Sequence, residues 1–422
     1  MVRNLVFLVV TVLAALPALV LRTVFGAHVD PAVGLVWHGG ALSPPVTTLV
    51  FGVAVLAAAF LISWAAELLQ LDISQNLAMA IVALLAVMPE YSVDMYLAWT
   101  AATVPENAPL ALANMTGANR LLIGLGWPAI AIAVLLRWKK RQTELEDSRW
   151  GEIFVLAVAT IYSFVLPLKG RLTIVDTGVF LCIFAFYIRY VSRQEVVEPE
   201  LGGPAELIGE LPPLWRRLAA AALFVVAGGT LLASAEPFAE GLKLTGRGWG
   251  VSEFLLIQWI APLASEAPEF IIALIFALRG MATAGFGALV SSKVNQWTLL
   301  VGMVPLAYGV GRLVHGLPMA TLPLDQRQFG ELLLTTAQSV FAVMIVIDRR
   351  FRFHEAMLLL GLFLAQFGIS VGIEELVAEA ARPFWFNVEK GVFSTIYVVL
   401  AIGWAVRHRH DIRKLVRYAV NA

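Results

Sequence analysis

Long apolar runs constrain the fold of this chain more than any other feature of its sequence. Of the 422 residues, 59% are hydrophobic and 14% are charged, whereas a soluble domain carries about 25% charged residues. Many of the runs approach or exceed the roughly 20 residues that a helix needs to cross a bilayer. We therefore expect an all-α polytopic membrane protein.

We expect twelve spans, at about 5–20, 46–69, 75–102, 108–136, 151–168, 172–192, 216–242, 250–278, 283–312, 329–348, 354–378 and 388–407. The first span has two interpretations. It resembles a signal peptide, because Val24-Phe25-Gly26-Ala27 offers small residues for cleavage, and it is also consistent with a retained first helix, which we favour. The polar segments 27–45, 137–149 and 193–217 are expected to be loops.

Charge distribution orients the chain. The 30 basic and 30 acidic residues cancel, so no overall field favours nucleic acid as a partner. With the amino terminus inside, about twice as many basic residues fall on the inner face as in the outer loops, to which we assign Lys390. We expect an integral protein of a prokaryotic plasma membrane with both termini cytoplasmic. The single cysteine, Cys182, excludes an intrachain disulfide, and His408 and His410 are expected in a solvated basic tail.

An internal repeat is visible around two Pro-Glu pairs, Pro89-Glu90 and Pro268-Glu269. An asparagine follows each glutamate, Asn119 after 29 residues and Asn295 after 26. Beyond each asparagine the chain reaches a glycine and then a proline: Gly126 and Pro128, Gly302 and Pro305. The copies lie five spans apart. An odd offset means that they enter the membrane in opposite senses, as in the inverted repeats of secondary transporters.

The proline before each glutamate has a physical consequence. Proline lacks a backbone donor and clashes with the carbonyl four residues earlier, so we expect each helix to open there. The freed carbonyls would be those of Leu85 and Ala264. A simple proline kink with an outward-pointing glutamate is the plainer interpretation.

Side chains with oxygen ligands cluster around the two Pro-Glu pairs. Carboxylate, amide and hydroxyl oxygens suit hard cations such as Ca²⁺, and charged groups at membrane depth usually mark an ion or substrate path. Acids three or four residues apart share a helix face. The candidate ion ligands are Glu90, Glu269, Glu266, Asp94, Asn114, Asn119, Ser265, Ser291 and Asn295.

Two bases, Arg120 and Lys293, lie within two residues of a repeat asparagine. Either can be a tethered cation that occupies part of the ion site, so that protonation of a partner links transport to protons. Either can equally be one half of a fixed intramembrane salt bridge. The sequence leaves both interpretations open.

At these residues the chain resembles the cation/Ca²⁺ exchanger superfamily, which includes Na⁺/Ca²⁺ and H⁺/Ca²⁺ exchangers. The matching elements are 85–90 with 113–119, and 264–269 with 289–295. The resemblance implies ten core transmembrane helices in two inverted repeats, plus about one extra helix at each end, and transport by alternating access. It also implies that Glu90 and Glu269 are the paired central carboxylates.

By the same resemblance, Ser265, Asn114 and Asn119 match accessory ligands, and the transported cations are Ca²⁺, Na⁺ or H⁺, with no resident cofactor. The chain departs from the family pattern in several places. Ala86 and Val87 replace hydroxyl positions, Glu266 replaces a hydroxyl of the second repeat, Val290 replaces an amide and Lys293 replaces glycine. These departures favour proton-coupled or otherwise altered exchange over a standard sodium-coupled site.

We divide the chain into an amino-terminal helix and loop (1–45), a first exchanger half (46–193), a central cytoplasmic linker (194–215), a second half (216–380) and a carboxyl-terminal helix with basic tail (381–422). A secondary cation antiporter is the leading hypothesis. An exchanger homologue with altered or lost transport, in which Arg120 and Lys293 occupy the ion site, is the alternative. An enzyme is disfavoured: the Gly-x-Ser-x-Gly at 368–372 lies in an apolar span without the strand-to-helix turn of a nucleophile elbow.

Overall fold

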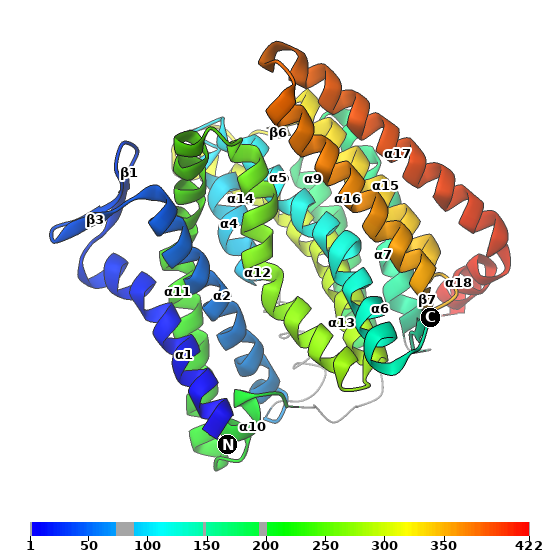
Figure 1. The fold of residues 1–422 in the computed structure, drawn as a ribbon, viewed down its shortest axis with the longest axis horizontal. Coiled ribbons are helices and arrows are strands. Elements are labelled where there is room, and N and C mark those ends of the chain that lie inside the picture. The colour runs from blue at the N-terminus through cyan, green and yellow to red at the C-terminus, as the bar shows by residue number, and fades with distance from the viewer. Residues whose placement is uncertain (1, 73–87, 147–148, 194–200, 422) are drawn as a thin grey trace. The chain divides into compact units, whose positions relative to one another are not determined.

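The computed structural model describes residues 2–72, 88–146, 149–193 and 201–421 (Figure 1). Within these ranges, eleven helical segments are long and apolar enough to cross a membrane: Val2–Val24, Pro44–Leu69, Asn107–Trp138, Trp150–Lys169, Ile174–Val191, Pro213–Trp249, Glu253–Leu278, Ala282–Val314, Gln326–Val346, Phe353–Leu376 and Glu379–Arg407. Each coincides with an expected span. The remaining expected span, 75–102, begins with 75–87, which lie outside the described residues, and its described part includes helix α4 (Met88–Thr100). The all-α membrane fold is confirmed.

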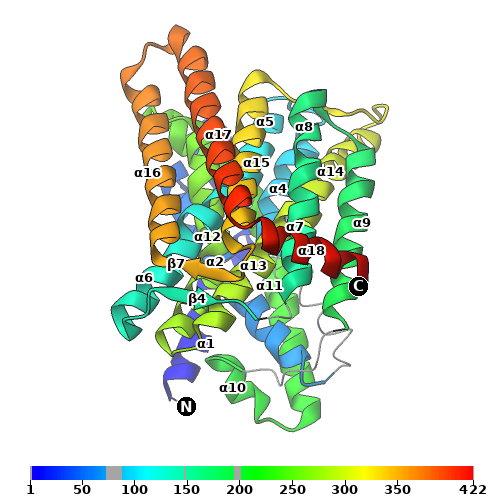
Figure 2. The ribbon, with the colours of Figure 1, turned by 90° about the vertical axis from the view of Figure 1, so that its right-hand side faces the viewer.

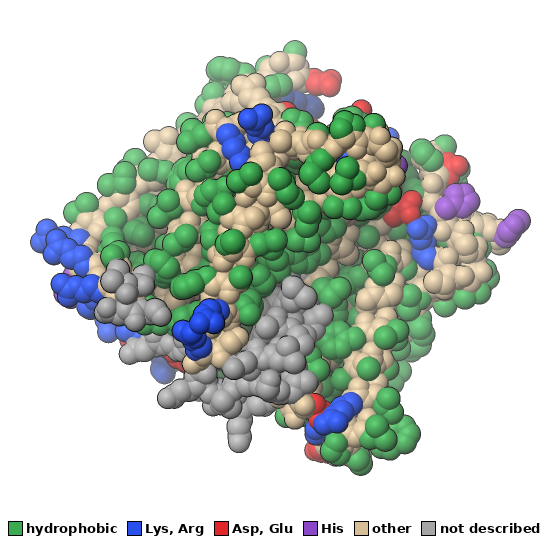
Figure 3. All heavy atoms as spheres, turned by 180° about the vertical axis from the view of Figure 1, so that it is seen from behind, with side chains coloured by type: hydrophobic (Ala, Val, Ile, Leu, Met, Phe, Trp, Pro, Cys, Tyr) green, Lys and Arg blue, Asp and Glu red, His purple; other side chains and the backbone are tan. Residues whose placement is uncertain are grey.

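The surface agrees with a bilayer setting. Hydrophobic side chains gather over much of the face shown in Figure 3, and Lys and Arg side chains form small, separate groups on it. Exposed apolar residues include Leu232, which is 82% exposed, and Leu136, which is 67% exposed. In lipid such residues need no polar cover, because the hydrocarbon core is itself the apolar environment.

The chain forms two compact units, Met1–Leu97 with Ile188–Pro268, and Ala98–Tyr187 with Glu269–Ala422. The first unit contains α1 (Val2–Leu19), η1 (Val20–Val24), β1 (His28–Asp30), β2 (Gly34–Trp37), β3 (Gly40–Leu42), α2 (Pro44–Leu69), α10 (Pro204–Gly209) and α11 (Pro213–Trp249), with the first parts of α4 and α12 (Glu253–Leu278).

Close packing of α2 against α11 forms the core of the first unit. A Cβ added at Gly52 would lie 2.9 Å from the Phe238 ring, and one at Gly241 would lie 2.9 Å from the Thr48 hydroxyl. Small residues let helices approach closely in membranes, where apolar burial drives association less than in water. On the other side of α2, Phe7 of α1 meets Trp64 edge-on at 5.1 Å between ring centroids.

The segment 27–45, expected as a loop, contains a three-stranded antiparallel sheet in the order β1-β2-β3. His28 pairs with Val36, and Leu35 pairs with Leu42. Leu35 is fully buried. Strands of three or four residues carry too little alternation of apolar and polar residues to be recognised from sequence.

The second unit contains more helices and strands than the first. They are α5 (Asn107–Leu121), η2 (Leu122–Gly126), α6 (Trp127–Trp138), β4 (Gln142–Glu144), α7 (Trp150–Ser163), α8 (Val165–Lys169), β5 (Arg171–Leu172), most of α9 (Ile174–Val191), the last part of α12, α13 (Ala282–Asn295), η4 (Gln296–Leu300), α14 (Val301–Val314), β6 (Leu322–Pro323), α15 (Gln326–Val346), β7 (Arg350–Arg352), α16 (Phe353–Leu376), η5 (Glu379–Ala381), α17 (Arg382–Arg407) and α18 (Arg409–Asn421).

Two short antiparallel pairs tie loops together in this unit, β4 with β7 and β5 with β6. Figure 2 shows β4 and β7 beside each other at one end of α16. Phe351 of β7 stacks on Phe286 of α13 with ring centroids 4.7 Å apart, and Trp127 meets the same two rings edge-on. This aromatic group fixes the loop between α15 and α16 to the ends of α6 and α13.

The expected helix opening before Glu269 is not present. Helix α12 runs through Pro262 and Pro268 to Leu278, and the corresponding position Leu85 lies outside the described residues. A proline removes one donor, but the flanking hydrogen bonds continue, and neighbouring groups in a membrane protein can satisfy the freed carbonyl. Pro268 is therefore accommodated without a break.

Candidate ion site

The second repeat brings Glu269 and α13 together in the second unit. Ser292 of α13 is a polar neighbour of the Glu269 carboxylate. The carboxylate oxygen Oε2 is buried and accepts no hydrogen bond from any residue that the structure describes. A carboxylate with one oxygen in this state keeps lone pairs for a cation or a proton.

Lys293 is completely buried and contacts Asn119, the asparagine of the first repeat. Its ammonium donates a hydrogen bond to Asn119 Oδ1 at 2.6 Å and lies 4.2 Å from the centroid of the Trp297 ring. The Asn119 amide nitrogen donates to the Met115 carbonyl at 2.8 Å, which orients the amide oxygen toward the lysine. A buried cation thus occupies one of the predicted ligand oxygens.

Both repeats carry a π-helical turn that begins within three residues after the asparagine. The segment η2 (Leu122–Gly126) links α5 to α6, and η4 (Gln296–Leu300) links α13 to α14. Such turns are uncommon and frequently occur at functional sites, because the extra residue re-aims the side chains that follow. The two copies are a structural repeat that the sequence analysis did not predict.

The two repeated glycines, Gly126 and Gly302, allow aromatic residues to approach the helix backbone closely. A Cβ at Gly126 would lie 2.8 Å from the Phe270 ring, and one at Gly302 would lie 2.9 Å from Phe180 Cβ. Each glycine therefore admits an aromatic side chain against the π-helical segment or the turn after it. Their matching positions after Asn119 and Asn295 were the available sequence signal for this local geometry.

Ser291 belongs to a different cluster of the second unit. Its hydroxyl donates to Glu152 Oε1 at 3.0 Å and accepts from Arg149 Nη1 at 2.9 Å. Arg149 and Glu152 also form an ion pair at 2.7 Å. These contacts link the start of α7 to α13, and they leave Ser291 engaged away from the Lys293–Asn119 contact.

Arg120 lies in an ion-pair cluster, which we call the buried charge cluster: Arg120, Glu331, Lys390 and Glu389. Arg120 Nη2 is 2.6 Å from Glu331 Oε2. Lys390 Nζ is 3.1 Å from Glu331 Oε1 and 3.3 Å from Glu389 Oε2. All four side chains are at most 3% exposed. The geometry is that of the intramembrane salt bridge rather than of a cation tethered at Asn119.

Helix α16 completes this cluster with neutral polar groups. Gln366 accepts from Arg120 at 3.3 Å and donates to Glu389 Oε1 at 2.5 Å, and Ser370 donates to the same oxygen at 3.1 Å. Lys390, expected in an outer loop, is instead buried in α17, because its ammonium finds two carboxylates there. Sequence reasoning missed Glu331 and Glu389, although acids inside apolar spans were a usable signal.

The other predicted ligands are buried within their own units. In the first unit, Glu90 and Asp94 lie on α4, and Glu266 lies on α12, each at most 1% exposed. Ser265 donates to the carbonyls of Ala261 at 3.3 Å and Pro262 at 3.2 Å.

In the second unit, Asn114 and Asn295 are at most 4% exposed. Across the described ranges, no three His, Cys, Asp or Glu side chains are grouped so that they could hold a metal ion by themselves.

Comparison with known proteins identifies the fold. The crystal structure of the H⁺/Ca²⁺ exchanger CAX superposes with a TM-score of 0.86 and 40% sequence identity, covering 98% of this chain and 97% of that chain. The structure of native YfkE (TM-score 0.58, 14% identity, 90% and 99% coverage) and a structure of the sodium-calcium exchanger NCX_Mj (0.51, 16%, 77% and 98%) share the fold. The comparison with curated proteins gives no match.

A family model extends the comparison to the sequence. The model described as sodium/calcium exchanger protein matches residues 43–193 and 219–372. These two regions fall on either side of the central polar segment and include both Pro-Glu pairs. The chain therefore belongs to the sodium/calcium exchanger family.

Proposed function

We propose that the protein is a secondary antiporter that exchanges Ca²⁺ for protons by alternating access, with Glu90 and Glu269 as its central carboxylates. The observation that carries this proposal is the 40% identity over 98% of the chain to a solved H⁺/Ca²⁺ exchanger. Membership of a transporter family also sets aside the enzyme hypothesis raised by the Gly-x-Ser-x-Gly at 368–372.

The residues support proton coupling on chemical grounds. A buried carboxylate is costly unless a proton or a cation neutralises it, so binding of one excludes binding of the other at the same oxygen. Sodium sites would need further hydroxyl or carbonyl oxygens, yet Ala86 and Val87 precede Glu90 where the family pattern has hydroxyls. The coupling ion that best fits these residues is H⁺.

We also propose the membrane arrangement in which residues 46–193 and 216–380 are the two exchanger halves and both termini are cytoplasmic. The basic groups at 137–141, 349–352 and 407–417 would then lie on the inner face, as the positive-inside rule requires. The two regions matched by the family model support these halves.

Ion flux in proteoliposomes tests the central claim. Purified protein is reconstituted with a lumenal Ca²⁺ dye and a pH dye, and H⁺ or Na⁺ gradients are imposed in turn. We expect Ca²⁺ movement under the H⁺ gradient, and its loss in Glu269→Gln, because the neutral amide neither ionises nor binds a divalent cation strongly. Glu144→Gln, at a surface position that is 58% exposed, is the matched control. Full activity of Glu269→Gln would refute the role of Glu269, and coupling to Na⁺ alone would refute proton exchange.

One observation favours the alternative in which transport is altered. The Lys293 ammonium holds Asn119 Oδ1 at 2.6 Å, so an incoming cation must displace it or do without that oxygen. Arg120 does not support the same alternative, since Glu331 engages it in the buried charge cluster.

Replacement of Lys293 by glycine tests this role. We expect Lys293→Gly to shift the ion preference or the pH dependence of transport, because a fixed positive charge is removed beside a predicted ligand. Lys139→Gly is the matched control, since Lys139 is exposed and already has a positive φ of 58° that glycine adopts freely. An unchanged ion and pH profile in Lys293→Gly would leave the lysine a structural role only.

A further inference from the structure

A short basic helix, α18 (Arg409–Asn421), follows the last membrane-spanning helix of the chain. Helix α17 ends at Arg407, and a single residue, His408, separates the two helices. In Figure 2, α18 turns away from the direction of α17 and runs across α7, against which it packs. Its buried Leu415 is 5% exposed and anchors the helix to the second unit.

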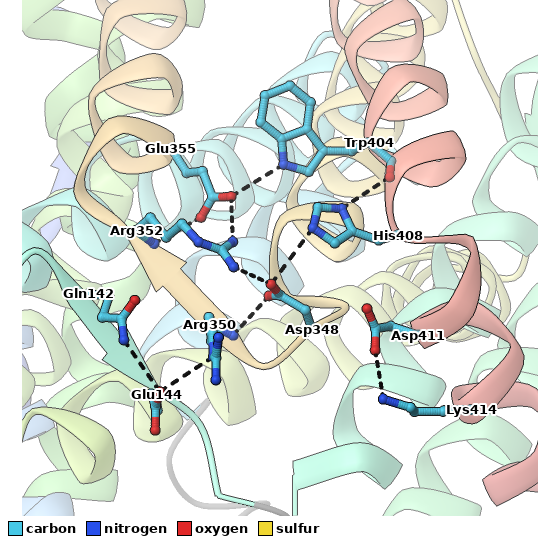
Figure 4. Close-up of polar contacts among 10 residues, drawn as sticks. All are labelled: Gln142, Glu144, Asp348, Arg350, Arg352, Glu355, Trp404, His408, Asp411 and Lys414. Carbon is cyan, nitrogen blue, oxygen red and sulfur yellow. Dashed lines mark hydrogen bonds and ion pairs between the residues drawn. The ribbon is translucent and has the colours of Figure 1, made fainter.

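The turn at His408 is fixed by polar contacts rather than left free in solvent (Figure 4). His408 Nδ1 lies 3.1 Å from the Trp404 carbonyl oxygen, and its Nε2 lies 3.7 Å from Asp348 Oδ2. This corrects the expectation of a solvated histidine. The start of α18 is therefore held at the end of α15.

A second layer of contacts holds Asp348 in turn. Arg352 Nη2 lies 2.5 Å from Asp348 Oδ2 and Nη1 lies 3.0 Å from Glu355 Oε1. The Trp404 indole donates to Glu355 Oε1 at 3.3 Å. The group connects α15, β7, α16 and α17, so α18 projects from a rigid junction of four elements.

The outer side of α18 is strongly cationic. Arg409, Arg413 and Arg417 are four residues apart, which places them on one face of a helix, and all three are exposed. Lys414 is also exposed, and its ion pair with Asp411 at 3.1 Å is the only one that the described part of α18 makes. None of the three arginines forms an ion pair with a residue that the structure describes.

An apolar residue accompanies this charge. Val416 is 55% exposed although it adjoins the basic row. A helix that presents cationic residues with an apolar residue beside them, placed directly after a membrane span, suits the boundary between lipid headgroups and acyl chains. Each Lys or Arg near an anionic membrane surface adds to the attraction, whereas zwitterionic lipid offers no comparable field.

We propose that α18 is a binding surface for the headgroups of anionic phospholipids in the leaflet that α17 reaches at Arg407. The arginine row contacts the phosphates, and Val416 contacts the adjoining acyl region. Arginine suits this role because its planar guanidinium donates two parallel hydrogen bonds to a phosphate. The lipid holds α18 against the membrane, and the His408–Asp348 junction transmits its position to the ends of α15 and α17.

Lipid titration of the full-length protein tests the proposal. Detergent-purified protein is titrated with phosphatidylglycerol and, separately, with phosphatidylcholine, and bound lipid is counted by native mass spectrometry. The variant Arg409→Gln/Arg413→Gln/Arg417→Gln removes three charges from α18. We expect its affinity for phosphatidylglycerol to fall roughly fivefold per charge, hence on the order of 100-fold, with phosphatidylcholine binding unchanged.

Two controls separate a site from general attraction. The loop variant Arg137→Gln/Lys139→Gln/Lys140→Gln removes three exposed charges from the same unit without touching α18, and we expect it to keep phosphatidylglycerol binding. The variant Arg409→Lys/Arg413→Lys/Arg417→Lys keeps the charge and should retain most of the affinity, which also reports on folding. Equal losses in the loop and α18 variants, or no loss in the α18 variant, would overturn the proposal.

Discussion

The buried charge cluster permits a quantitative test of the second unit. Glu331 receives Arg120 at 2.6 Å and Lys390 at 3.1 Å, one cation on each oxygen. Replacement of Glu331 by glutamine removes the anion and leaves Arg120 and Lys390 facing a neutral amide. The cluster of two cations and two anions then carries one uncompensated positive charge at a site where Arg120 is 2% exposed.

Loss of one partner from a buried ion pair costs about 3–5 kcal/mol, because the remaining charge keeps its desolvation penalty. We therefore expect Glu331→Gln to lower the free energy of unfolding by about that amount, measured by denaturant titration in detergent micelles. Glu144→Gln breaks an exposed ion pair, in which Glu144 Oε1 lies 3.4 Å from Arg350 Nε. The Arg350 side chain is 54% exposed and the Glu144 side chain is 58% exposed. Exposed pairs contribute about 0–1 kcal/mol, so this variant is the matched control.

A double replacement separates charge balance from simple loss of contacts. Arg120→Met with Glu331→Gln removes one charge of each sign and leaves Lys390 paired with Glu389 at 3.3 Å. The double variant should therefore recover most of the stability that Glu331→Gln loses, giving a large coupling energy in the mutant cycle. The reasoning is refuted if Glu331→Gln is no less stable than Glu144→Gln, or if the two losses simply add.

Two further variants test contacts elsewhere in the chain. The hydrogen bonds from Arg216 lower the pKa of Asp72 to about 2, below the unfolded value of about 3.9, so this carboxylate stabilises the fold above pH 4 and loses its effect as the pH falls toward 2. The stability difference between wild type and Asp72→Asn should accordingly be full at pH 6 and shrink below pH 4 in unfolding titrations; a constant difference would contradict it. At Gly285, an added Cβ would lie 2.5 Å from the Ala273 carbonyl oxygen, so Gly285→Ala should destabilise by about 1–3 kcal/mol. Gly361→Ala, where nothing lies within 4 Å, should not destabilise the protein, and equal losses in the two would refute the packing argument.

The membrane spans and the repeat could be predicted because their signals are local. Helices in lipid must satisfy their own backbone hydrogen bonds, so a span is a continuous apolar run that is visible in the sequence. The prediction that α12 opens before Glu269 was wrong. A rule for a single proline does not describe how the surrounding helix and its neighbours accommodate that proline. The π-helical turns were missed because the repeated glycines that accompany them, Gly126 and Gly302, are equally compatible with an ordinary helix.

The partners of the buried charges could not be predicted, because they are contacts between residues far apart in the sequence. The sequence by itself determined that Arg120 and Lys293 lie at membrane depth beside repeat asparagines, since apolar runs and spacing suffice for that. It left open whether each base is a tethered cation in the ion site or one half of a fixed salt bridge. The tertiary structure decided it: Arg120 meets Glu331 across a separation of 211 residues, and Lys293 meets Asn119 across 174. A buried cation must find an oxygen wherever the packing of distant helices brings one within reach, and no local pattern records which helices those are.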